Sequence, residues 1–210
     1  MTDYSEVIPN TKFMKKTFLS AIGLAALLAA AIVSCQQKPT AAAETGTVAA
    51  PTRVELAKRG EHLVNVLGCD DCHSTKTFGP GGPEIDTAHR LAGHLSGAPL
   101  PVADTGALKK GWVLFAPDLT AAVGPWGTSY SANLTSDETG IGNWSEAQFI
   151  KAIREGKLKG MDNSRPLLPP MPWFNYARLE DNDLKAIYYF LQSTKPVHNV
   201  VPPPQPPVSL

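Results

Sequence analysis

"GCDDCHS", residues 68–74, places two cysteines three positions apart and follows the second one directly with a histidine. The chain of 210 residues contains only 3 cysteines, so this short stretch uses most of them. Three chemistries use such a spacing: half of a zinc site, a thiol–disulfide redox pair, and the covalent attachment of haem. The rest of the sequence has to discriminate between them.

Zinc binding and thiol redox chemistry find little support elsewhere in the chain. A zinc site needs four ligands, typically from a second Cys or His pair, but His89 and His94 lie in Gly- and Pro-rich sequence without such a spacing. A thioredoxin-like pair begins a helix that follows a strand. Residues 52–67 instead have apolar residues at helical spacing, so the cysteines come at the end of a helix. A structural disulfide is the other alternative.

The pattern Cys-x-x-Cys-His favours attachment of a c-type haem. Two thioethers, from Cys69 and Cys72, tether one porphyrin, and His73 then lies beneath the iron as its proximal ligand. A sixth ligand is most often a methionine. We expect Met171 rather than Met161, because prolines on both sides of Met171 fix the backbone that presents it. Four histidines are alternative ligands: His62, His89, His94 and His198.

The N-terminus has the pattern of a targeting segment. Lys15 and Lys16 precede an apolar stretch over residues 18–33, and the sequence "IVSC" ending at Cys35 resembles a bacterial lipobox, in which the cysteine is acylated. We therefore expect an N-terminal extension and lipoprotein-type signal peptide over residues 1–35. A cleaved signal without a lipid and an uncleaved anchor are the alternatives, and all three export the remainder. Residues 36–52 are small and polar, which predicts a flexible tether that reaches roughly 20–25 Å.

The charge balance argues against nucleic acid as a partner. Lys and Arg number 19, and Asp and Glu also number 19, so no basic excess is available for phosphates.

Three stretches, "GEHLVNVLGCDDCHS", "SANLTSDETGIGNWSEAQFIKAIREGK" and "LLPPMPWFNYARLEDNDLKAIYYFLQSTKPVHN", resemble a class I monohaem c-type cytochrome. The similarity is greatest to the cytochrome domains found with bacterial dehydrogenases. It implies an all-α class I cytochrome c fold around one haem, held covalently through Cys69 and Cys72, with His73 and Met171 as iron ligands. It also implies that further side chains line the haem edge or meet a propionate: Asn133, Thr135, Trp144 and Arg165.

The helical pattern agrees with this resemblance. We expect helices over residues 52–67, after Ser145, and over residues 179–194, within a cytochrome domain at residues 53–200. By resemblance the first and last helices cross, with Gly60 against Tyr188 or Tyr189. Residues 76–131 are rich in Gly and Pro and predict a long ordered insertion, in which residues 112–115 could form a short strand. Residues 201–210 predict a Pro-rich tail.

These features together predict a one-electron carrier, not an enzyme, that lies outside the cytoplasm and is tethered to a bacterial membrane by a lipid on Cys35. Its partners would be redox proteins such as a dehydrogenase, an oxidase or another cytochrome. One alternative is a fixed electron-transfer subunit of a periplasmic dehydrogenase or oxidase complex. A haem enzyme such as a peroxidase, with an open distal position, and a binding module without haem are further alternatives.

Overall fold

Helix α1 (Arg53–Val66) begins with a capping box formed by Thr52 and Glu55. The Glu55 amide donates to the Thr52 hydroxyl at 3.3 Å, and the Glu55 carboxylate accepts from the Thr52 amide at 2.8 Å. The computed structural model describes residues 50–207, so the expectations for residues 1–35, Cys35 and most of the tether lie outside the described residues. The predicted helix over residues 52–67 is confirmed.

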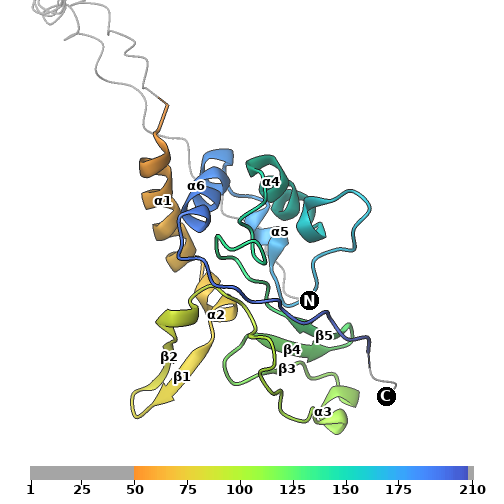
Figure 1. Cartoon of the computed structure of the whole chain (residues 1–210). Coiled ribbons are helices and arrows are strands. Elements are labelled where there is room, and N and C mark those ends of the chain that lie inside the picture. Colours follow the sequence, from red (N-terminus) through yellow and green to blue (C-terminus); the bar gives the residue numbers. More distant parts are fainter. Residues whose placement is uncertain (1–49, 208–210) are drawn as a thin grey trace, which may run out of the picture. The chain divides into compact units, whose positions relative to one another are not determined.

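Helix α6 (Asp181–Gln192) packs against α1 in the largest contact between two helices of the described chain (Figure 1). Gly60 makes the close approach possible, because a Cβ atom there would lie 1.9 Å from the Ala186 carbonyl oxygen and 2.7 Å from the Phe190 Cβ. The crossing is confirmed, but its partner residues differ from those expected. The Tyr188 hydroxyl donates to the Trp144 carbonyl at 2.7 Å, and the Tyr189 ring lies under the Arg53 guanidinium.

Helix α4 (Glu146–Glu155) completes the helical part and is capped by Ser145 as expected, with the Gln148 amide donating to its hydroxyl at 3.1 Å. The short helices η3 (Leu158–Gly160) and α5 (Trp173–Tyr176) follow. The core between α1, α4 and α6 also takes in two residues from the connecting segments. Its buried members are Val64, Leu91, Ile141, Phe149, Ile187, Phe190 and Leu191.

The expected all-α fold is wrong, because the insertion over residues 76–131 contains two antiparallel sheets. Strands β1 (Lys76–Gly79) and β2 (Gly82–Ile85) form a hairpin, which the short helix η2 (Thr87–His89) follows. After helix α3 (Thr105–Lys109), strands β3 (Leu114–Phe115), β4 (Ala121–Gly124) and β5 (Gly127–Tyr130) form the second sheet. Each strand has four residues or fewer, too few for alternating burial to mark it in the sequence.

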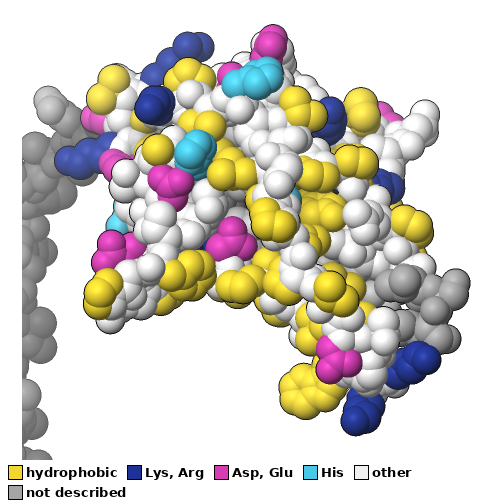
Figure 2. Space-filling model, turned by 60° about the horizontal axis from the view of Figure 1, so that its bottom comes forward, with side chains coloured by type: hydrophobic (Ala, Val, Ile, Leu, Met, Phe, Trp, Pro, Cys, Tyr) yellow, Lys and Arg dark blue, Asp and Glu magenta, His cyan; other side chains and the backbone are white. Residues whose placement is uncertain are grey.

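The insertion also carries much of the exposed apolar surface of the described residues. Phe78 on β1 is 60% exposed, and Trp112 and Phe115 around β3 are 65% and 46% exposed. Figure 2 views the molecule from the side on which the hairpin and α3 lie in Figure 1, and hydrophobic side chains are spread over that face.

The chain returns from α6 to the insertion through its Pro-rich end (Figure 1). There Gln205 pairs with Thr128 of β5, with both amide-to-carbonyl distances at 3.0 Å. Within residues 50–207, no helix has the length and apolar character needed to cross a membrane.

Candidate haem-binding site

Cys69 and Cys72 lie three residues apart in the single-turn helix α2 (Cys69–His73), so their side chains share one side of that helix. Both are free, half-buried thiols. Burial and the neighbouring Asp70 carboxylate raise the pKa of Cys69 to about 12, and burial also raises the pKa of Cys72. A thiol–disulfide pair needs a stabilised thiolate, so this setting does not favour thiol redox chemistry.

Ionic and polar contacts hold α2 in place. The buried Asp70 carboxylate accepts from the Arg90 guanidinium at 2.8 Å and from the Ser74 hydroxyl at 2.6 Å. The Lys76 ammonium donates to the carbonyls of Ser74 at 2.7 Å, Asp70 at 3.0 Å and Asp118 at 2.9 Å. A cation at the carboxyl end of a helix satisfies carbonyls that the helix itself leaves unpaired. The turn that carries the cysteines is therefore fixed from both ends.

His73 is oriented by two backbone groups that come later in the sequence. Its Nδ1 lies 2.7 Å from the Ala132 carbonyl oxygen, and its own carbonyl accepts from the Gly93 amide at 2.8 Å. Because Nδ1 must carry the hydrogen in the first of these bonds, Nε2 keeps its lone pair and can bind a metal. Burial lowers the pKa of His73, which also favours the neutral ring. The two thiols of Cys69 and Cys72 and the Nε2 atom of His73 fit a c-type haem.

The segment of Met171 is brought toward α2 by α5. The Tyr176 hydroxyl, at the end of α5, donates to the Leu67 carbonyl at 3.1 Å, two residues before Cys69. Burial raises the pKa of Tyr176, and the nearby Cys69 and Cys72 contribute to that shift. Met171 is half-buried in the connection that leads into α5, whereas Met161 is 51% exposed. Met171 stays the predicted second iron ligand.

The structure gives Asn133 and Trp144 supporting roles close to this region. Asn133 is 4% exposed, and its side chain accepts from the Thr135 amide at 2.9 Å and donates to the Val197 carbonyl at 2.9 Å. These bonds fix the loop next to Ala132. Trp144 packs half-buried against the core. Arg165 is exposed and donates to the Pro166 carbonyl at 2.8 Å.

The alternative histidine ligands are engaged elsewhere or lie on the surface. His94 is buried, with Nδ1 2.8 Å from the Thr120 hydroxyl, and His89 lies 2.6 Å from the Asp86 carboxylate. His198 lies 3.4 Å from Asp137, and His62 is exposed. Within residues 50–207, no group of three or more His, Cys, Asp or Glu side chains is arranged to hold a metal ion.

Sequence reasoning missed several groups that support the site. Lys76 follows His73 by three residues, and a cation just after a helix was a readable signal. The Ala132 carbonyl and the contact between Ser129 and Pro169, at 2.6 Å, involve backbone atoms, which no residue type reveals.

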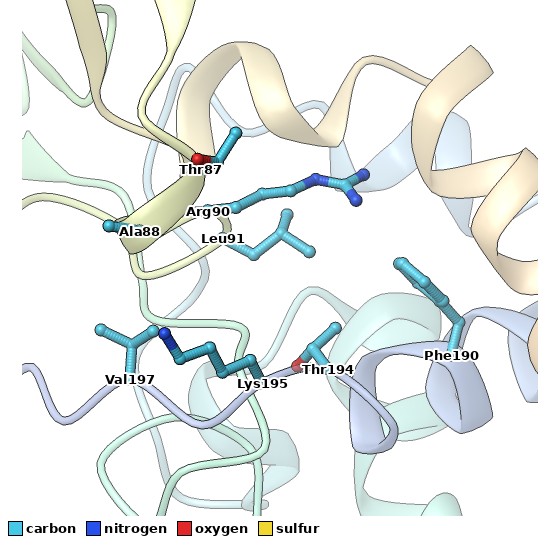
Figure 3. Close-up of a pocket in the computed structure, with 8 residues that line it drawn as sticks. All are labelled: Thr87, Ala88, Arg90, Leu91, Phe190, Thr194, Lys195 and Val197. Atoms are coloured by element: carbon cyan, nitrogen blue, oxygen red, sulfur yellow. The ribbon is translucent and has the colours of Figure 1, made fainter.

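A separate cavity of about 210 Å³ lies between η2 and the end of α6. In Figure 3 the Arg90 guanidinium points away from Lys195, in keeping with its bonds to Asp70 and Asn65. None of the predicted site residues lines this cavity, which is bounded by Thr87, Ala88, Arg90, Leu91, Phe190, Thr194, Lys195 and Val197.

Comparison with known proteins identifies relatives whose names describe them as cytochrome subunits. No protein-family model matches the chain. It is 36% identical over 144 residues to the gluconate 2-dehydrogenase cytochrome c subunit of Pantoea cypripedii, a match that covers 68% of this chain and 24% of that protein. It is 32% identical over 146 residues to the alcohol dehydrogenase (quinone) cytochrome c subunit of Gluconobacter oxydans, covering 68% of this chain and 22% of the relative.

A third relative, the fructose dehydrogenase cytochrome subunit of Gluconobacter japonicus, is 41% identical over 85 residues, covering 40% of this chain and 17% of that protein. The chain thus spans about a quarter or less of the length of these relatives. The similarity to these relatives and the geometry of Cys69, Cys72 and His73 support the same conclusion. The chain is a c-type cytochrome related to the cytochrome c subunits of bacterial dehydrogenases.

Proposed function

We propose that this protein transfers single electrons through one covalently bound haem c and has no catalytic activity of its own. The observation that carries the proposal is the imidazole of His73, which is held at Nδ1 by Ala132 and keeps Nε2 for a metal. A haem bound here supplies a one-electron couple at its iron. Cys69 and Cys72 would hold it through thioethers, and His73 and Met171 would be its iron ligands.

The chain's own residues would keep the ligands still while the charge changes. Lys76 and Arg90 fix the turn that carries the cysteines, and Ala132 fixes the histidine ring. A rigid ligand set rearranges little when an electron arrives or leaves. The thioether of Met171 would favour the reduced state of a haem bound here and thereby give a fairly positive potential.

The proposed location is the periplasmic face of a bacterial membrane, or the periplasm. The support comes from the sequence: a lipoprotein-type signal over residues 1–35, Cys35 as the lipid acceptor, and a tether over residues 36–52. The cytochrome domain would then span residues 53–200 and the tail residues 201–210. Haem attachment of this kind takes place outside the cytoplasm, in agreement with export.

The first experiment measures the mass of the denatured, acid-extracted protein. We expect a coloured polypeptide whose mass exceeds the bare chain by one haem. A colourless chain with the mass of peptide alone, or of peptide plus lipid, would refute the proposal.

The second experiment tests the ligands with ferric absorption spectra of wild type, Met171→Ala and Met161→Ala. The sulfur–iron charge-transfer band should disappear only in Met171→Ala. Met161→Ala is the matched control, because it removes a thioether from an exposed position. A band that survives in Met171→Ala rules that residue out as a ligand.

A second candidate function is that of a fixed electron-transfer subunit in a dehydrogenase complex. The names of the relatives favour it, since they are described as subunits of gluconate, alcohol and fructose dehydrogenases. A fixed subunit should co-purify with a catalytic chain after mild cross-linking of whole cells, whereas a free carrier should purify as a monomer.

A further inference from the structure

Ser129 of β5 connects the insertion to the segment that carries Met171. The serine is 6% exposed, and its hydroxyl oxygen lies 2.6 Å from the Pro169 carbonyl oxygen. Pro169 precedes Met171 by two residues. One buried hydroxyl group therefore lies next to the backbone that presents the methionine.

The direction of this hydrogen bond follows from the other partners of the hydroxyl. The Trp126 indole nitrogen, which can only donate, lies 3.1 Å from the Ser129 oxygen. The serine accepts that hydrogen and is free to donate its own. Of the two carbonyls within reach, Pro169 at 2.6 Å is much closer than Ala122 at 3.4 Å. Ser129 thus donates to Pro169.

The strand that carries Ser129 is held on both edges. On one side Ser129 pairs in register with Ala122 of β4. On the other, Thr128 exchanges two backbone hydrogen bonds with Gln205, each at 3.0 Å. Strand β5 and the C-terminal segment pass so closely at Gly127 that a Cβ atom there would lie 2.1 Å from the Gln205 carbonyl oxygen.

The methionine segment has fewer contacts of its own. Pro169 and Pro170 are exposed, and the Met171 amide makes only a long 3.3 Å bond to the Leu168 carbonyl. The segment contains four prolines between residues 166 and 172, which cannot donate backbone hydrogen bonds. The Leu167 amide fixes the start of the segment on the Gly156 carbonyl at 2.7 Å, and Ser129 adds a donor from outside the segment two residues before Met171.

We propose that Ser129 is a positioning residue that holds Met171 on the haem iron through the Pro169 carbonyl. This inference rests on the proposed ligation by Met171. Loss of the hydroxyl lets the segment move away more often, so an external ligand competes more successfully for the ferric iron.

The experiment compares holoprotein of wild type, Ser129→Ala and Ser131→Ala by titration with imidazole. Ser131 follows the same strand, and its hydrogen bonds to Thr120 and His94 are made by its backbone, which the alanine variant keeps. We expect imidazole to bind Ser129→Ala roughly three- to tenfold more tightly, the effect of one hydrogen bond. The reduction potential should fall in the same variant, because the thioether favours the reduced iron. Ser131→Ala should match wild type in both measurements.

A matched pair keeps the test decisive if Ser129→Ala folds poorly. Ser129→Thr and Ser129→Val have the same shape and differ only in the hydroxyl, so packing changes cancel between them. The valine variant should bind imidazole more tightly than the threonine variant. Equal affinities in this pair, or a Ser129→Ala variant that loses thermal stability without a change in imidazole affinity, would overturn the inference.

Ligation by Met171 and positioning by Ser129 are refuted by different results. If Met171→Ala keeps the sulfur–iron band, Met171 is not a ligand and the ligation itself is refuted. If that band is lost but Ser129→Ala titrates like wild type, the ligation stands and only the role of Ser129 is wrong.

Discussion

Asn199 joins parts of the chain that are about a hundred residues apart. It is 5% exposed, and its amide donates to the carbonyls of Ala92 at 2.8 Å and His94 at 2.9 Å. Its oxygen accepts from the Ser96 amide at 2.8 Å. Gly93, between the first two partners, also binds the His73 carbonyl, so Asn199 stabilises the support of the histidine.

Replacing Asn199 with alanine would leave buried backbone groups unpaired. We expect the holoprotein to lose about 2–3 kcal/mol of unfolding free energy, measured with urea. Asn163→Ala, at an exposed position, should change it by less than about 0.5 kcal/mol. Similar losses in both variants would contradict the role assigned to Asn199.

The ionisation of Asp70 makes the unfolding free energy depend on pH in the acid range. Burial alone raises the pKa of its carboxyl, but hydrogen bonds from Arg90 and Ser74 and the charge of Arg90 outweigh burial and bring that pKa below its ordinary value. The unfolded chain therefore takes up the proton first as the pH falls, and stability decreases from about pH 4 downward, through the folded-state pKa.

The matching variant is Asp70→Asn. It should be less stable than wild type at pH 7 and should lose less stability between pH 7 and pH 3. Urea midpoints of both proteins at the two pH values measure this. Parallel pH profiles would show that Asp70 does not cause the acid sensitivity.

At the scale of elements, the sequence predicts what local chemistry determines. Thr52 with Glu55 and Ser145 with Gln148 mark helix starts, because capping involves residues three positions apart. The cysteines and the histidine of α2 could also be predicted, because their spacing lies within five consecutive residues. The partners of Gly60 could not be predicted, since the rotation of α6 that places Ala186 and Phe190 there depends on the whole core.

Gly60→Leu should prevent folding, because even a Cβ atom would lie 1.9 Å from the Ala186 oxygen. Thermal unfolding followed by far-ultraviolet circular dichroism measures the effect. Glu61→Leu, at the next and exposed position of α1, is the control and should leave the melting temperature nearly unchanged. An unaltered melting temperature in Gly60→Leu would refute the close helix crossing.

At the scale of the whole molecule, the sheets of the insertion were the part that the sequence could not predict. Their pairing joins segments such as Leu114 and Val123, or Thr128 and Gln205, through backbone atoms. Composition suggested order in this region and a short strand at residues 112–115, where β3 lies, but not the pairing of strands into two sheets. The contact between Ser129 and Pro169 could not be predicted either, because its acceptor is a backbone carbonyl.

Deletion of residues 202–210 tests the pairing of the tail. The Thr128 amide loses its partner, and its hydrogen exchange should become at least about tenfold faster. The Ser131 amide, which donates to the Thr120 carbonyl at 2.8 Å, is the internal control and should stay protected. Unchanged exchange at Thr128 would mean that the tail does not pair with β5.

The distance in sequence between His73 and Ala132 sets an order of events during assembly. These residues are 59 positions apart, and closing a long loop is opposed by entropy until many contacts form together. In a chain that emerges N-terminus first, Cys69, Cys72 and His73 are accessible well before the carbonyl that aligns the imidazole exists. Whatever is joined to the two sulfurs at that stage meets a freely rotating ring, and the later hydrogen bond from Nδ1 to the Ala132 carbonyl then leaves Nε2 to face it.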